Sequence, residues 1–171
     1  MQHKLNQPPA MSRAFKQAIY QVHSPVDLVE LRIGKVSGSL RKHMQALGIK
    51  HAAIISAYNP QAQLTGDNLN RHAHSTLLQA VEALQLPWWP AVNIDPSGGW
   101  PAEPSILILG ITVDQARWLA RRFRQLAFVS IGPRAVPKLN FVQQHMPSFS
   151  KKNAALPQTE TAVPLVNTLK H

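Results

Sequence analysis

A single carboxylate stands where the chain enters one of its most apolar segments. Residues 100–105 read W-P-A-E-P-S and lead directly into I-L-I-L-G at 106–110, a run that predicts a buried β-strand. Glu103 therefore lies between two prolines at the edge of the core, where a carboxylate loses part of its hydration. Such a group needs a cation, hydrogen bonds or a ligand to offset that loss. The segment predicts a paired or functional carboxylate at this strand end.

Further polar residues follow the apolar run at 51–58, which predicts a central strand. Tyr58 and Asn59 end this run in front of Pro60, and a proline forces the preceding residue into an extended or turn conformation. Asn68 and Arg71 lie three residues apart near the start of the next predicted helix, and therefore on one helical face. Segments that end a rigid element commonly present functional polar groups.

These segments predict an ion pair between Arg71 and Glu103, with Trp100 as a lid. One interpretation is a structural cluster that orients a helix against a strand end, and the other is a ligand pocket. No second carboxylate lies nearby in the sequence for paired acid–base chemistry, and Ser105 has no histidine or lysine partner to activate it. Whether the chain is an enzyme stays open at this point.

The histidines do not predict a metal site. His72 and His74 are two residues apart, so they point to different faces of a helix and cannot chelate one ion as an i, i+4 pair would. The chain has no cysteine, and it carries neither a phosphate-binding glycine loop nor a dinucleotide-binding motif. We therefore expect neither a metal nor a cofactor.

Arginines crowd one predicted helix, at residues 113–125. Arg117, Arg121 and Arg124 have the spacing of one helical face, and Arg122 and Trp118 lie beside them. The whole chain has 18 Lys and Arg against 8 Asp and Glu, a formal net charge of +10. A basic surface with an exposed aromatic ring can hold phosphates and stack on bases. An ordinary solvated helix face with arginines near its C-terminus explains the same pattern.

Two functions therefore remain open. The first is a non-enzymatic binding or accessory protein that uses its basic surface to contact a polyanion, such as RNA or a ribonucleoprotein. The alternative is a small-molecule enzyme or ligand sensor, with a pocket formed by Tyr58, Asn59, Arg71, Trp100 and Glu103. The direction of these five side chains separates the two hypotheses, because convergence on a partly empty cavity favours the second.

Composition and chain length predict one folded domain. The 171 residues are 44% hydrophobic, enough for a core of ordinary size. We expect a flexible segment at 1–15, a single α+β domain at 16–142 and a disordered basic tail at 143–171, because both ends are polar and interrupted by proline. No apolar run approaches the roughly 20 residues of a membrane span, and the first residues lack the apolar stretch of a secretory signal. A cytoplasmic location is therefore expected.

Alternating strand-like and helix-like patterns must position the polar residues. Apolar runs predict strands at 18–22, 28–34, 51–58, 105–111, 127–131 and 138–142. Residues 87–94 read as an edge strand or extended segment, since their two prolines cannot donate to a ladder. Helical spacing predicts helices near 39–48, 67–85 and 113–125, the second with its apolar face at Leu69, Ala73, Leu77, Ala80 and Leu84.

The fold class that these elements predict is α+β. We expect a single mixed β-sheet of about five to six strands with three helices, mainly on one face. It would be built around two βαβ-like units, at 30–57 and 107–131, because each reads strand, helix, strand.

Four segments occur in a distinctive order: A-I-I-S-A-Y-N-P, N-L-N-R, W-P-A-E-P-S-I-L-I-L-G-I and A-R-W-L-A-R-R-F-R-Q-L-A-F-V. In these the chain resembles the bacterial domain of unknown function 3293 family, over residues 18–142. The family pattern matches this sequence at Asn59, Pro60, Asn68, Arg71, Trp100, Glu103, Pro104, Ser105 and Gln125. The candidate ligand-binding residues are then Tyr58, Asn59, Asn68, Arg71, Trp100, Glu103, Ser105 and Gln125.

Arg124 departs from the family pattern, which more usually has glycine at this position. If that glycine lets a ligand approach closely, Arg124 would obstruct or replace the contact. The family has no established activity, so the resemblance supports the fold and the site but names no function.

Overall fold

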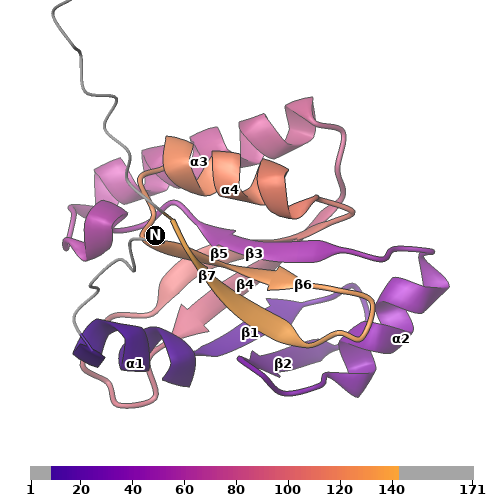
Figure 1. Cartoon of the computed structure of the whole chain (residues 1–171). Coiled ribbons are helices and arrows are strands. Elements are labelled where there is room, and N and C mark those ends of the chain that lie inside the picture. Colours follow the sequence, from indigo (N-terminus) through magenta and orange to yellow (C-terminus); the bar gives the residue numbers. More distant parts are fainter. Residues whose placement is uncertain (1–8, 143–171) are drawn as a thin grey trace, which may run out of the picture.

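Seven strands form one sheet in the order β2-β1-β4-β5-β3-β6-β7, and every pair of neighbours is antiparallel. The computed structural model describes residues 9–142 and is drawn in Figure 1. The strands are β1 Ile19–His23, β2 Leu28–Arg32, β3 Ala52–Ser56, β4 Trp88–Ile94, β5 Glu103–Leu109, β6 Ala127–Ile131 and β7 Pro137–Phe141. The helices are α1 Pro9–Gln17, α2 Gly38–Ala46, α3 Asp67–Ala83 and α4 Val113–Arg122, with a single 3-10 turn η1 at Pro60–Ala62.

The predicted α+β class with a single sheet is confirmed, but the count and the pairing differ. The described residues contain seven strands and four α-helices, where five to six strands and three helices were expected. The sheet is antiparallel rather than mixed. Both differences arise because β4 is a full strand and because no two neighbouring strands run in the same direction.

The strand β4 lies inside the sheet, between β1 and β5, and not at an edge as its prolines suggested. Leu109 N–H donates to the Pro87 carbonyl (2.9 Å), so the backbone polar groups of Pro87 face β5. Alternation along the chain then turns the nitrogen of Pro90 towards β1. The ladder between β1 and β4 ends at the pair Val22 and Ala91, so Pro90 stands where no donor is required.

The expected βαβ units are present only in split form. β5 and β6, joined by α4, run in the same direction, but β3 lies between them. β3 and β4, joined by α3, are likewise separated by β5. Residues 52–131 therefore form the interlocked β-α-β-β-α-β arrangement of ferredoxin-like folds. The other predicted unit, β2-α2-β3, is not such a crossover, because three strands separate β2 from β3.

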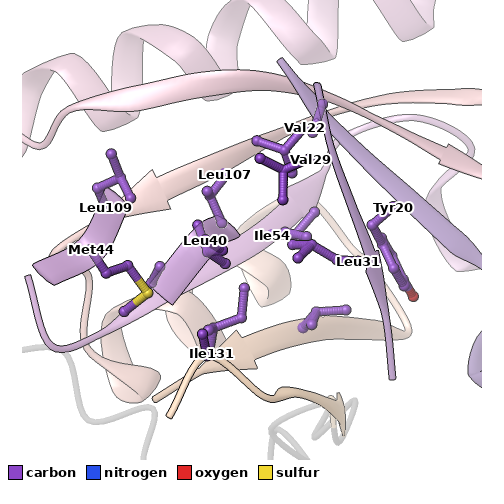
Figure 2. Close-up of a cluster of buried hydrophobic side chains, with 14 residues drawn as sticks. Tyr20, Val22, Val29, Leu31, Leu40, Met44, Ile54, Leu107, Leu109 and Ile131 are labelled. Carbon is purple, nitrogen blue, oxygen red and sulfur yellow. The ribbon is translucent and has the colours of Figure 1, made fainter. Parts of the chain in front are cut away.

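The two faces of the sheet carry separate hydrophobic cores. α3 and α4 cover one face together (Figure 1). Their residues Leu77, Leu119 and Ala120 belong to one core cluster with Ile106 and Ile108 of β5. α2 covers part of the other face, where Leu40 and Met44 lie among the side chains of the central strands (Figure 2). The helices are thus divided between the faces. The expectation that they lie mainly on one face holds for α3 and α4 alone.

The buried face of α3 matches the predicted one at Ala73, Leu77 and Ala80 but not at its ends. Leu69 is 67% exposed and Leu84 36%, whereas Asn70, Leu77 and Val81 are buried. The buried face therefore starts with a polar side chain. Asn70 is buried because it has hydrogen-bond partners there, described below.

The N-terminal part of the described chain is helical where a flexible segment was expected. α1 spans Pro9–Gln17, and the Tyr20 hydroxyl donates to the Phe15 carbonyl (3.3 Å). The rest of the predicted flexible segment and the predicted disordered tail at 143–171 lie outside the described residues. Within residues 9–142 no helix is long and apolar enough to cross a membrane.

Candidate functional site

A cavity of about 260 Å³ opens at one end of the sheet. Tyr20 of β1, Asn93 of β4 and Glu103 of β5 line it as direct cross-strand neighbours, so their side chains share the face that α2 covers elsewhere. The remaining wall residues that matter here are Phe15 of α1, Asn59 after β3, Asp95 and Trp100 in the loop after β4, and Gln125 after α4. The helix α1, which the sequence did not indicate, therefore forms part of the cavity wall.

One oxygen of Glu103 is held in place by two donors. Asn59 Nδ2 donates to Glu103 Oε1 at 2.7 Å, and Trp100 Nε1 donates to the same oxygen at 2.8 Å. Oε2 accepts no hydrogen bond from the described residues. Because it is not one of the fully buried side-chain atoms that lack a partner, it is not completely buried. The carboxylate is thus oriented through one oxygen while the other remains accessible.

Asn59 follows β3 and is connected by hydrogen bonds to α3 and to Glu103. Its backbone is left-handed (φ 47°, ψ 60°), a conformation that asparagine tolerates better than most residues. Its N–H donates to Asn70 Oδ1 (2.9 Å), and its own Oδ1 accepts from Asn70 Nδ2 and from Thr65 N–H, each at 3.0 Å. Because the oxygen of its side-chain amide accepts from Asn70 and Thr65, the amide is held in the orientation that directs Nδ2 to Glu103.

The electrostatics of the cavity are acidic. Burial raises the pKa of Glu103, and the hydrogen bonds from Asn59 and Trp100 oppose this to a smaller extent. Burial also raises the pKa of Tyr20, with the Glu103 carboxylate as a further cause. Hydrogen bonds from Ser97 lower the pKa of Asp95. No Lys, Arg or His belongs to the wall formed by the described residues.

The structure brings half of the eight predicted site residues together. Asn59, Trp100, Glu103 and Gln125 line the cavity. Ser105 is buried next to it and donates to Asn93 Oδ1 (2.8 Å). The other three predicted residues, Tyr58, Asn68 and Arg71, lie elsewhere.

Each residue outside the cavity has a local explanation. The Tyr58 ring contacts His74 of α3, edge to face, with ring centroids 5.8 Å apart. Asn68 does not cap α3, whose N-cap is Gly66, but accepts a hydrogen bond from Arg71. Asn68 and Arg71 both belong to α3.

The predicted Arg71–Glu103 ion pair is wrong. Arg71 lies 3.8 Å from Asp67 within α3, and its side chain is 63% exposed. Glu103 is satisfied instead by two neutral donors, Asn59 and Trp100. Because the buried face of α3 begins at Asn70, Arg71 is rotated out to solvent.

Sequence reasoning missed four residues of this region: Tyr20, Asn70, Asn93 and Asp95. Tyr20 and Asn93 come from strands whose pairing with β5 leaves no local trace in the sequence. Asn70 stands inside the motif N-L-N-R, and its position seven residues before Leu77 was an available sign that it lies on the buried face. Asp95 supplies the second carboxylate that appeared to be absent.

The arrangement can hold a cation or accept a proton. Glu103 lines a partly apolar cavity with one carboxylate oxygen that accepts no hydrogen bond from the described residues, and burial raises its pKa above the ordinary value. Aromatic rings of Phe15, Tyr20 and Trp100 lie around it. Within residues 9–142 no three His, Asp or Glu side chains are grouped closely enough to hold a metal ion.

The four candidate arginines of the basic surface do not form one stripe. The guanidinium of Arg117 lies over the Phe128 ring, 5.7 Å from its centroid, and that of Arg122 lies over Trp118 at 5.5 Å. α4 ends at Arg122, so Arg124 is outside the helix and the predicted i, i+7 spacing does not apply. Arg121, Arg122 and Arg124 are exposed.

Arg124 occupies the left-handed position that closes α4. Its φ is 54°, its N–H donates to the Arg121 carbonyl, and Gln125 N–H donates to the Ala120 carbonyl. These two bonds define a Schellman motif, in which glycine is preferred at the left-handed residue. The glycine that the family more usually has at this position is therefore explained by the helix end and not by a close approach to a ligand.

One comparison with known proteins matches the part of the chain that contains this site. Residues 55–128 match the model of a family described as Protein of unknown function (DUF3293), which confirms the resemblance found in the sequence. The matched stretch runs from within β3 to within β6, so it includes Asn59, Asn70 and Glu103. No curated protein and no solved structure matches the chain.

Proposed function

We propose that this chain, whose residues 55–128 match the DUF3293 family model, binds a small organic cation next to Glu103. A protonated amine is the group of choice, because it can donate to the free carboxylate oxygen while its apolar part contacts the aromatic walls. This is a small-molecule function, the alternative of the two that the sequence left open.

The observation that carries the proposal is the state of the Glu103 carboxylate. One oxygen is fixed by Asn59 and Trp100, the other accepts no hydrogen bond from the described residues, and Glu103 lines a cavity whose described wall contains no basic residue. The two donors therefore orient the carboxylate without occupying its second oxygen. In a chain with a net charge of +10, an acidic cavity is a local exception that a cationic ligand would use.

The size of the cavity limits the ligand. Its volume of about 260 Å³ lies below the roughly 300–1,000 Å³ of typical drug-sized sites. The rings of Phe15, Tyr20 and Trp100 can stabilise a cation by cation–π interaction as well as by contact area. A single ring or short alkyl chain that carries one amine fits these conditions.

The test compares two probes that differ in charge, benzylamine and benzyl alcohol. The Trp100 indole N–H contacts Glu103 directly, so its NMR resonance reports on binding at the carboxylate. We expect benzylamine to shift this resonance saturably, and benzyl alcohol to bind at least about tenfold more weakly, because it forms no charge-assisted hydrogen bond.

A matched variant separates recognition from packing. Glu103→Gln keeps an acceptor oxygen for Asn59 and Trp100 but removes the charge, so it should lose the preference for benzylamine over the alcohol. Asp67→Asn serves as control, since Asp67 is an exposed carboxylate on α3. Equal affinity for both probes in the wild type, or an unchanged preference in Glu103→Gln, would exclude the proposal.

A second function, polyanion binding, is supported by one observation on α4. Arg121, Arg122 and Arg124 are exposed around the end of this helix, and none forms an ion pair with a described acidic residue. Trp118, 53% exposed, lies beneath the Arg122 guanidinium. Arginines beside an exposed ring suit phosphate contacts and base stacking, as in RNA or a ribonucleoprotein.

The salt dependence of binding to a single-stranded RNA oligonucleotide tests this second function. Replacing Arg121, Arg122 and Arg124 by glutamine should weaken binding. It should also flatten the slope of log affinity against log salt by about 0.7 for each phosphate that is no longer neutralised. The control replaces three other exposed cations by glutamine, namely Arg41, Lys42 and Lys50. The same slope in both triple variants would argue that general charge, and not this surface, attracts the RNA.

A further inference from the structure

A second cavity, of about 240 Å³, lies between the β6–β7 hairpin and the start of α4. It is at the opposite end of β3 from Glu103: His51, which precedes β3, lines this cavity, whereas Asn59, which follows β3, lines the other. Three basic side chains belong to its wall, namely His51 before β3 and Arg134 and Lys138 of the β6–β7 hairpin. No acidic residue belongs to the described wall.

We infer that this second cavity binds the phosphate group of a small ligand. None of His51, Arg134 and Lys138 forms a hydrogen bond or ion pair with another described side chain. Their donors are therefore not consumed within the described part of the protein. Arginine and lysine are the side chains that most often recognise phosphate, arginine through its planar fork and lysine as a point charge.

The backbone around Arg134 holds its position. Ala135 N–H donates to the Gly132 carbonyl (2.8 Å), which closes a turn with Pro133 in its second place, where proline already has the required φ. Ala135 is fully buried, and its carbonyl accepts from Ser37 N–H (3.0 Å) at the start of α2. The turn is tied to the body of the protein, so little backbone freedom is lost when Arg134 engages an anion.

Lys138 is placed by the sheet. It is the cross-strand partner of Ser130, so both side chains are on the same face, and both line the cavity. The Ser130 hydroxyl accepts a hydrogen bond from Asn140 Nδ2 (2.8 Å), which leaves its own hydrogen available to an anion oxygen. Val113, the first residue of α4, completes this side of the wall, while Asp114 in the same turn does not belong to it.

The volume and the donors together select the ligand class. A cavity of about 240 Å³ is smaller than the roughly 300–1,000 Å³ of sites for drug-sized ligands, so it suits one phosphate group with a small substituent. Because the charged side chains of Arg134 and Lys138 line it and no acidic residue belongs to its described wall, a doubly charged phosphate is favoured over a singly charged carboxylate. The site is separate from the amine site proposed at Glu103 and does not depend on it.

The test is an NMR titration of the full chain with inorganic phosphate at constant ionic strength, balanced with sodium chloride. We expect saturable shifts of the backbone amides of Val113, Gly132 and Arg134. Replacing Arg134 and Lys138 together by glutamine should weaken the affinity at least about tenfold, because charge-assisted hydrogen bonds are removed. Both residues are exposed, so the double variant should fold, which a thermal unfolding curve checks.

A second double variant controls for net charge. Arg13→Gln with Lys16→Gln removes the same two charges from α1, which lines the other cavity at the opposite end of β3, and should leave the affinity for phosphate within about twofold, because exposed charges far from the site are screened. Equal losses in both double variants, or shifts that do not saturate, would overturn the assignment. Acetate bound as tightly as phosphate would overturn the ligand class.

The source of the phosphate is distinguished in the same experiment. A short single-stranded oligonucleotide offers phosphates on a polymer, whereas methyl phosphate offers one on a small molecule. Stronger shifts of the same amides by methyl phosphate place a small metabolite in the cavity. If only the oligonucleotide produces saturable shifts, the inference of a small phosphate ligand is rejected.

Discussion

Asn70 is the buried side chain on which the geometry of Glu103 depends. It is 4% exposed, and its amide accepts from Asn59 N–H and donates to Asn59 Oδ1 and to the Thr65 carbonyl, at 2.9, 3.0 and 2.9 Å. Asn59 in turn donates to Glu103. Replacing Asn70 by alanine removes all three bonds and leaves the buried Asn59 N–H without a partner.

The size of the effect follows from these contacts. Three hydrogen bonds at about 1 kcal/mol each give about 3 kcal/mol, and an orphaned buried donor adds to the cost. Alanine recovers about 0.6 kcal/mol, because it has a higher helix propensity than asparagine. We therefore expect Asn70→Ala to lower the free energy of unfolding by about 2–4 kcal/mol.

Urea unfolding at neutral pH measures this loss, with Asn68→Ala as a matched control. Asn68 is an exposed asparagine in the same helix turn, and its side chain accepts a single hydrogen bond from a described residue, the exposed Arg71, so its replacement should change stability by less than about 0.5 kcal/mol. The indole N–H resonance of Trp100 should also shift in Asn70→Ala, because Glu103 loses its orientation by Asn59.

A loss of less than about 1 kcal/mol of unfolding free energy in Asn70→Ala would refute this prediction, since the loss of three hydrogen bonds from a buried amide costs more than that. An equal loss in Asn68→Ala and Asn70→Ala would also refute it. In that case the common factor would be the helix and not the hydrogen bonds to Asn59 and Thr65.

Three further predictions concern single residues of the same region. Arg124→Gly should raise the free energy of unfolding by about 1 kcal/mol, because the backbone at this position is left-handed. Arg121→Gly, inside α4, should lower it by a similar amount. If urea unfolding shows a loss of stability in both variants, the assigned helix end is contradicted. Because burial raises the pKa of Glu103 above its ordinary 4.5, the folded state retains a proton that the unfolded state releases, so wild-type stability falls as pH rises above 4.5. Glu103→Gln removes this term and should gain stability relative to the wild type between pH 4.5 and neutral pH; urea unfolding across that range checks the sign, and a relative loss would refute it. Arg71→Met should change stability by less than about 0.5 kcal/mol and should be additive with Glu103→Gln in a double-mutant cycle, because the two side chains do not pair. A coupling energy above about 1 kcal/mol would show that they do interact.

Local patterns in the sequence were sufficient for most of the elements. Apolar runs and helical spacing predicted six strands within a few residues of their ends, and they predicted α2, α3 and α4. These signals are local, because a strand or helix needs apolar residues at its own period to face a core. Glu103 was recognised for the same reason: a carboxylate at the start of an apolar strand stands out within a few residues of sequence.

Relations between distant segments were decided only by the tertiary structure. No local pattern shows that β4 lies inside the sheet or that β3 separates β5 from β6, because strand order depends on which faces can be buried together. The helix start at Asp67 leaves the rotation of α3 undecided by one residue, and that one residue places Asn70 inwards and Arg71 outwards.

The partners of Glu103 follow from that rotation and from the pairing of the sheet. Asn59 is 44 residues away in sequence, and it reaches Glu103 because β3 and β5 are neighbours. Tyr20 and Asn93 join the same cavity through the register of β1, β4 and β5. Sequence alone determined that this carboxylate needs a partner, whereas the burial of three strands against one another determined that its partners are neutral and that one oxygen stays free.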